Sequence, residues 1–142
     1  MVKEPFKLTV IRKESFNSAH RLHNRNLSAE ENKQLFGKCN NTNFHGHNYE
    51  LEVFVTGEVD PITGYVIDLK ILKDIIKQEV TQKFDHKNLN LDVPEFEKLN
   101  PTAENISIVV YQLIRAKLDK KYDLHIVLHE TEKNSVLYPP RH

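Results

Sequence analysis

The strongest constraint on the fold is a regular alternation of side chains from His45 to Thr56. Side chains of a β-strand point to opposite faces with a period of two. One parity carries His45, His47, Tyr49, Leu51, Val53 and Val55, and the other carries Glu50, Glu52 and Thr56, with Phe54 as the exception. We therefore expect a half-buried strand whose apolar face is continued by two histidines.

Further strands, two longer helices and one short helix are expected around this strand. Extended structure is predicted from Phe6 to His20 with a turn or bend near Lys13, at Tyr65–Ile67 as the second arm of a hairpin, from Asp123 to Thr131, and at Val136–Tyr138. Helices are predicted after the cap Asp68, after Pro101 and Thr102, and within the polar excursion from Asn24 to Gly37, where Ser28 and Glu31 form a capping box. Strands in runs with helices between them predict an α+β fold: an antiparallel four-stranded sheet with two helices on one face. Long strands with uncovered edges invite pairing with another copy.

Composition narrows the class of protein. The 142 residues suit a single domain, residues 1–142, and 39% hydrophobic residues are ordinary for a globular chain. The formal net charge is zero, so nothing indicates a nucleic-acid surface. No apolar run is long enough to span a bilayer, and Met1–Lys7 contains no apolar signal-peptide core. One cysteine cannot form an internal disulfide, so we expect a reducing, cytoplasmic setting.

Three histidines indicate a metal site. His-x-His on a strand places both imidazoles on one face, and His20 shares its parity with Phe16 and Ser18. A lone strand histidine is more often structural, and a His-x-His pair can also be solvated on a surface strand. Here the pair continues an apolar face, where unpaired imidazoles would be costly. Together His20, His45 and His47 predict a mononuclear zinc site with an open position for water or substrate.

Four other side chains are candidates for chemistry. Cys39 lies beside Lys38 and near asparagines, six residues before His45; an isolated cysteine is most often an inert core residue, but a neighbouring cation and metal favour a reactive thiolate. Asp85-His86 is either a polar loop or a pair that relays a proton. Glu130 shares its parity with Leu128 and needs a partner on an apolar face, which a ligand with paired N–H donors would supply.

Spaced blocks along nearly the whole chain resemble the 6-pyruvoyltetrahydropterin synthase family. They are Ser15–Leu22, Phe36–Asn41, His45–Tyr49, Gly57–Pro61, Gly64–Leu69, Leu72–Lys73, Phe84–Leu89, Pro101–Asn105 and His129–Thr131. The excursion from Asn24 to Gly37 resembles the eukaryotic-type enzymes. The resemblance implies the tunnelling fold, in which three subunits form a barrel and two trimers stack into a homohexamer.

The resemblance also implies an activity and a site. The family's zinc ligands fall on His20, His45 and His47, its catalytic cysteine on Cys39, its Asp-His pair on Asp85 and His86, its pterin-anchoring glutamate on Glu130, and pocket residues on Thr102 and Glu104. The expected enzyme is a zinc lyase of tetrahydrobiopterin biosynthesis that converts 7,8-dihydroneopterin triphosphate to 6-pyruvoyl-tetrahydropterin and triphosphate. No nicotinamide is needed, and no Gly-rich dinucleotide loop is present in the sequence.

Alternatives and one departure accompany this resemblance. A 6-carboxytetrahydropterin synthase would use the same scaffold, although the excursion weighs against it. Relatives that act on dihydroneopterin in folate synthesis would carry glutamate in place of Cys39. A non-catalytic zinc-binding or pterin-binding module would need neither the thiol nor Asp85-His86. Phe44 stands where the family often has glycine, which leaves substrate preference open.

Overall fold

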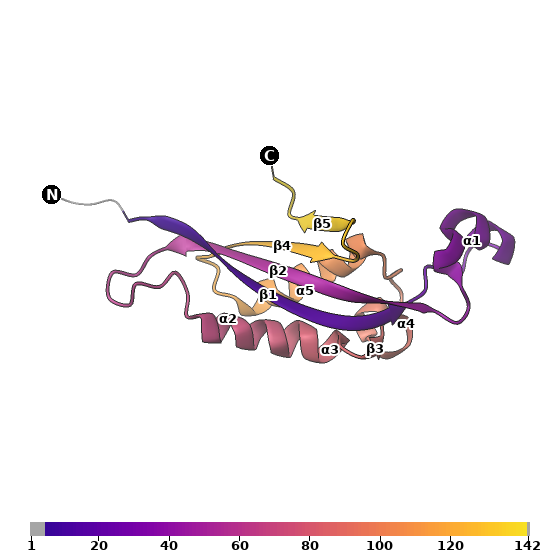
Figure 1. Cartoon of the computed structure of the whole chain (residues 1–142), viewed down its shortest axis with the longest axis horizontal. Coiled ribbons are helices and arrows are strands. Elements are labelled where there is room, and N and C mark those ends of the chain that lie inside the picture. Colours follow the sequence, from indigo (N-terminus) through magenta and orange to yellow (C-terminus); the bar gives the residue numbers. More distant parts are fainter. Residues whose placement is uncertain (1–4, 142) are drawn as a thin grey trace.

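A long antiparallel pair of strands forms the frame of the molecule (Figure 1). β1 (Lys7–His20) and β2 (His45–Glu58) pair along their full length, from Lys7 opposite Glu58 to His20 opposite His45. The structure is a computed structural model and describes residues 5–141. Residues 1–4, on which part of the expectation for Met1–Lys7 falls, lie outside the described residues. Because the two strands are in register at both ends, each end of the pair gathers side chains from distant parts of the chain.

The sheet has five strands rather than the predicted four. Its order is β3-β1-β2-β4-β5, with β4 (Asp123–His129) antiparallel to β2 and β5 (Ser135–Tyr138) antiparallel to β4. The additional strand is β3 (Lys87–Asn88), which pairs parallel to β1 at Ser18 and Ala19. Two residues cannot show an alternation, so the sequence carries no periodic signal for β3.

Two other predictions about strands are wrong. The expected turn or bend near Lys13 is absent, because Lys13 stays in register opposite Glu52 within one continuous β1. Tyr65–Ile67 is not a strand. Val66 and Ile67 are both buried, so two consecutive side chains face the core and the segment lacks strand alternation. The preceding turn is closed instead by Asp60, whose N–H donates to the Tyr65 carbonyl at 2.8 Å.

Helices cover the buried face of the sheet. α2 (Leu69–Ile76) begins after the predicted cap Asp68 and continues through a π-helical turn (Lys77–Thr81) into α3 (Gln82–Phe84). α5 (Ala103–Lys117) begins at the predicted start of the second helix, with Thr102 as its N-cap. The fully buried side chains of the core are Tyr49, Leu51, Val53, Val55, Leu72, Ile76, Val80, Phe84, Leu89, Ile106, Val110, Ile114, Ile126 and Leu128. The predicted helix-on-sheet layering is therefore confirmed.

The π-helical turn follows from the spacing of the core residues. Leu72, Ile76, Val80 and Phe84 recur every four residues, and all are fully buried. An α-helix has about 3.6 residues per turn, so a strict repeat of four drifts by about 40° at each step. A π turn winds one more residue per turn, as in the Gln82 N–H that donates to the Lys77 carbonyl. The wider turn keeps the four side chains directed at the sheet.

Short helical segments complete the connection from β1 to β2 and the connection from β3 to α5. α1 (Ala29–Phe36) has the predicted capping box, in which the Glu31 N–H donates to Ser28 Oγ at 3.1 Å and the Ser28 N–H donates to Glu31 Oε1 at 3.0 Å. A 3₁₀ turn (Gly37–Asn40) follows, and α4 (Leu89–Asp92) and a 3₁₀ turn (Pro94–Phe96) precede α5. Figure 1 shows α1 beyond one end of the long strands. Within residues 5–141, no helix is both long and apolar enough to cross a membrane.

Candidate metal centre and active site

Strand pairing brings the three predicted histidines together. His20 ends β1 and lies opposite His45, which begins β2, while His47 lies opposite Ser18. One ring nitrogen from each of the three lies within 4.8 Å of the others, and His20 Nε2 lies 2.9 Å from His45 Nε2. The register of β1 and β2 thus builds a compact group of three imidazoles from residues 25 positions apart.

His20 is held in one orientation by its surroundings. The ring is 1% exposed. Its Nδ1 lies 2.7 Å from the Pro101 carbonyl oxygen, to which an Nδ1–H donates, and 3.4 Å from the Tyr49 hydroxyl. Burial lowers the pKa of His20 to about 4; the Pro101 bond raises it, and the neighbouring His45 and His47 make smaller contributions that lower it. A neutral ring protonated at Nδ1 presents the Nε2 lone pair to the group, which is how histidines ligate metals.

The donor set fits a metal ion. Within residues 5–141, His45 Nδ1 and His47 Nε2 are buried and have no hydrogen-bond partner. Leaving a buried polar atom unsatisfied costs about 1–3 kcal/mol, whereas coordination would satisfy an imidazole nitrogen. Burial also lowers the pKa of His45, with a smaller contribution from His47 that Glu130 opposes. Three imidazoles are a set that zinc accepts with a fourth position open.

Cys39 lies on the same groove as two of these histidines. The thiol is in the 3₁₀ turn and half-buried, and the Leu22 N–H donates to the Cys39 carbonyl at 2.8 Å. A cavity of about 1070 Å³ is lined by Arg21, Ala29, Lys33, Gly37, Lys38, Cys39, Asn40, Asn41, Thr42, His45 and His47; we call it the thiol groove. The predicted proximity of the thiol to the His-x-His pair is therefore observed within one chain.

Asp85 and His86 lie elsewhere in the single chain. Asp85 Oδ1 accepts from the Asn17 N–H at 2.8 Å, and the His86 N–H donates to the Asn17 carbonyl at 2.7 Å. The His86 ring, 84% exposed, has its Nε2 3.6 Å from Asp85 Oδ2. Neither residue lines the thiol groove. The structure pairs the two side chains with each other at the outer edge of β1 and does not bring them to Cys39 within one chain.

The predicted pterin-binding residues are divided between two elements. Glu130 directly follows β4, and its charge raises the pKa of Tyr49, although burial of the phenol is the larger cause. Glu130 is therefore close enough to act on both Tyr49 and His45. Thr102 Oγ1 accepts from the Asn105 N–H at 3.1 Å and so caps α5, whose first turn contains Glu104. Neither Thr102 nor Glu104 lines the thiol groove.

Two groups around the site were missed from the sequence. The Pro101 carbonyl fixes His20, yet a backbone oxygen gives no signal in a side-chain pattern. Tyr49 shares the parity of His47 and could have been found from that alternation. Its ring packs edge-on to His20 at 6.2 Å between centroids and to His47 at 5.5 Å.

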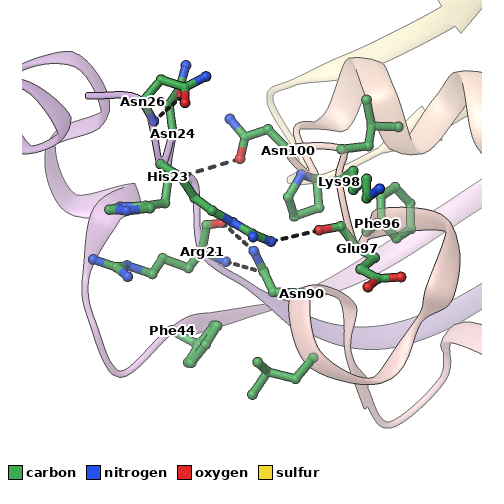
Figure 2. Close-up of a pocket in the computed structure, with 14 residues that line it drawn as sticks. Arg21, His23, Asn24, Asn26, Phe44, Asn90, Phe96, Glu97, Lys98 and Asn100 are labelled. Carbon is green, nitrogen blue, oxygen red and sulfur yellow. Dashed lines mark hydrogen bonds between the residues drawn. The ribbon is translucent and has the colours of Figure 1, made fainter. Parts of the chain in front are cut away.

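A second hollow lies along the segment that follows β1, where Arg21 and His23 line it (Figure 2). Its volume is about 600 Å³, and its lining includes Arg25, Phe44, Glu97, Lys98 and Pro101; we call it the Pro101 hollow. Phe44 has φ of 66°, a left-handed backbone conformation that favours glycine. This explains physically why glycine suits a position where this chain carries a phenylalanine.

Known proteins are similar to this chain in sequence and in fold. A sequence model of the family described as 6-pyruvoyl tetrahydropterin synthase matches residues 9–141. A protein of Poecilia reticulata named 6-pyruvoyl tetrahydrobiopterin synthase is 44% identical over 129 residues, which cover 91% of this chain and 88% of that protein. The human protein of the same name is 43% identical over 129 residues, covering 91% and 89%. The solved structure of Caenorhabditis elegans 6-pyruvoyl tetrahydropterin synthase superposes with a TM-score of 0.91 at 39% identity, covering 99% of this chain and 100% of that one.

Proposed function

The chain belongs to the 6-pyruvoyl tetrahydropterin synthase family, and on this premise we propose that it converts 7,8-dihydroneopterin triphosphate to 6-pyruvoyl-tetrahydropterin and inorganic triphosphate in tetrahydrobiopterin biosynthesis. The observation that carries the proposal is the thiol groove, where Cys39 lies beside His45 and His47. Substrate and products balance without water or an external oxidant, because the redox change stays within the pterin and its side chain.

We propose that His20, His45 and His47 hold a zinc ion through ring nitrogens. When bound, the ion supplies Lewis acidity toward the hydroxyl oxygens of the substrate side chain. The chain's own contribution is to hold His20 neutral through burial and to orient its ring through the Pro101 carbonyl, which lies 2.7 Å from His20 Nδ1. The burial of His20 also keeps water away from its ring.

Cys39 is proposed as the base that takes a proton from the substrate side chain. Its position on the groove shared with His45 and His47 supports this role. Glu130 is proposed to anchor the pterin ring by accepting paired hydrogen bonds from its amino group and ring N–H. Thr102 and Glu104 are proposed to line the pocket around that ring.

Asp85 and His86 are proposed to reach the site of a neighbouring copy, where they would tune or relay the proton held by Cys39. Their place at the outer edge of β1, outside the lining of their own thiol groove, supports this. Within residues 5–141 no strand pairs with that edge from Lys7 to Phe16. An open edge of this length suits the proposed trimeric barrel, stacked as a homohexamer with the tunnelling fold. The single cysteine supports a cytoplasmic setting.

The test is incubation of the metal-loaded protein with 7,8-dihydroneopterin triphosphate, followed by mass analysis of the pterin product. A pterin that has lost triphosphoric acid and carries a pyruvoyl chain is the expected result. A carboxyl-bearing pterin would instead identify a 6-carboxytetrahydropterin synthase. Recovery of unchanged substrate would refute the lyase proposal and leave a zinc-binding or pterin-binding module.

A further inference from the structure

The thiol groove carries an unbalanced positive charge. Three cationic side chains, Arg21, Lys33 and Lys38, line it together with Cys39 and the two histidines, and no carboxylate is among its lining residues. Within residues 5–141, none of the three cations takes part in a salt bridge. Uncompensated cations with low-dielectric walls between them raise the local concentration of an anionic ligand.

Arg21 is fixed in place rather than mobile on the surface. Its N–H donates to Asn90 Oδ1 at 2.8 Å, and Asn90 Nδ2 donates back to the Arg21 carbonyl at 2.9 Å. Its side-chain Nε donates to the Asn40 carbonyl at 3.0 Å. Only Nε is used, so the two terminal nitrogens of the guanidinium remain to donate. A guanidinium held in this way loses little rotamer freedom when it binds an oxyanion in a forked geometry.

The Asn40 region also ties Arg21 to the thiol. Cys39 precedes Asn40, and the Cys39 carbonyl accepts from Leu22, the residue after Arg21. Two adjacent residues of one segment are thereby bonded to two adjacent residues of the other. One bond from the Arg21 side chain and one backbone bond thus hold the segment of Arg21 against the segment of Cys39.

The Pro101 hollow is less suited to a polyanion. Arg21 lines both this hollow and the thiol groove, and Arg25 and Lys98 line the hollow too. Glu97 lines the hollow as well, and Arg25 already donates to the Glu97 carbonyl at 3.0 Å. In Figure 2 the Arg21 side chain extends away from Glu97 and Lys98. The negative charge of Glu97 would repel the anionic ligand that the cations of the thiol groove attract.

We infer that Arg21, Lys33 and Lys38 form the binding site for the triphosphate tail of the substrate, with Arg21 as its fixed, forked donor. This inference rests on the proposed function and adds the residues that recognise the leaving group. The substrate carries its reacting side chain between the ring and the triphosphate. A tail bound at Arg21 therefore places the reacting carbons over Cys39 and the histidines, on the same groove. The same cations stabilise the charge of the triphosphate as it departs.

The experiment compares metal-loaded parent protein with the variants Arg21→Gln, Lys33→Gln and Lys38→Gln. We expect Arg21→Gln to raise KM for dihydroneopterin triphosphate by about tenfold or more, and each lysine variant by several-fold, since charge-assisted bonds are lost. The slope of log KM against log salt should become shallower in each variant. Affinity for phosphate-free dihydroneopterin, followed by fluorescence, and metal content should stay within about twofold of the parent. Arg21→Lys should fall between parent and Arg21→Gln, because it keeps the charge and loses the fork.

Matched controls are Arg25→Gln and Lys98→Gln, which remove one cation each from the Pro101 hollow. Both should leave KM and its salt dependence within about twofold of the parent. The inference is overturned if these controls raise KM while the groove variants do not. It is also overturned if Arg21→Gln weakens the binding of phosphate-free dihydroneopterin as much as the binding of dihydroneopterin triphosphate. An inactive parent protein is a different failure, because it refutes the proposed function itself.

Discussion

Acid should destabilise the metal-free protein through His20. The side chain is 1% exposed, and burial lowers its pKa to about 4 from the usual 6.5. Below pH 6.5 the unfolded chain therefore binds a proton at this residue that the folded chain refuses. Because stability rises with pH wherever the unfolded state holds more protons, it must fall as the pH drops from about 6.5 toward 4.

The size of the effect follows from the shift. One pKa unit corresponds to about 1.4 kcal/mol, so the full shift of His20 amounts to about 3 kcal/mol once the pH is below 4. Between pH 7 and pH 5 only part of it applies, and the expected loss is about 2 kcal/mol. Above pH 6.5 the contribution is absent, because His20 is neutral in both states.

The assay is urea unfolding at about pH 7 and pH 5 after metal removal by a chelator, at one fixed protein concentration. Other groups titrate in this range, so the parent is compared with His20→Gln, whose neutral amide can still donate to the Pro101 carbonyl. The free energy of unfolding should fall by about 2 kcal/mol more in the parent than in the variant. The control variant is His125→Gln. His125 is half-buried and lies on the face of β4 opposite the buried Leu124 and Ile126, so this variant should show the same pH dependence as the parent.

Equal losses in the parent and in His20→Gln would refute this reasoning. That result would mean that His20 takes up its proton in the folded state at an ordinary pH, and that burial does not keep it neutral. The argument for His20 as a neutral, preformed metal ligand would fail with it.

Three further predictions concern separate parts of the site. Cys39→Ala should retain metal content and thermal stability but lose turnover by at least about a hundredfold, because a general base contributes about 10²–10⁴-fold; full activity would exclude the thiol as the base. Ser28→Ala should lower stability by about 1 kcal/mol through loss of the capping box, and hydrogen exchange should locate the loss in α1; unchanged exchange there would contradict the cap's role. Phe44→Gly should change the free energy of unfolding by less than about 1 kcal/mol, because relief of about 1–2 kcal/mol of left-handed strain is offset by the greater freedom of glycine when unfolded and by lost burial of the ring. A loss above about 3 kcal/mol in thermal unfolding would instead identify the ring as an essential packing group.

Local patterns predicted much of this structure. The alternation from His45 to Thr56 predicted β2 and its histidine face. The caps at Ser28 and Asp68, and a helix start after Pro101 and Thr102, were found where the sequence predicted them. These features depend on neighbours within a few residues, and such neighbours are visible in a sequence.

Features that depend on distant pairing were not predictable in the same way. β3 exists because Ser18 and Ala19 offer it an edge, and its two residues carry no pattern of their own. The position of Asp85 depends on a bond to the Asn17 backbone across 68 residues. His20 is oriented by a carbonyl 81 residues away. In each case the partner is a backbone group whose place is set only once the sheet and helices have packed.

The open edge of β1 also bears on how a free chain avoids fibril formation. Unpaired N–H and C=O groups on a long strand can recruit any extended segment, and β1 carries Leu8, Val10 and Ile11 close together. Charged residues interrupt this apolar stretch at Lys7, Arg12, Lys13 and Glu14, and such residues oppose indefinite stacking of strands. The edge therefore combines backbone groups that can pair with another strand and a charge pattern that disfavours open-ended growth.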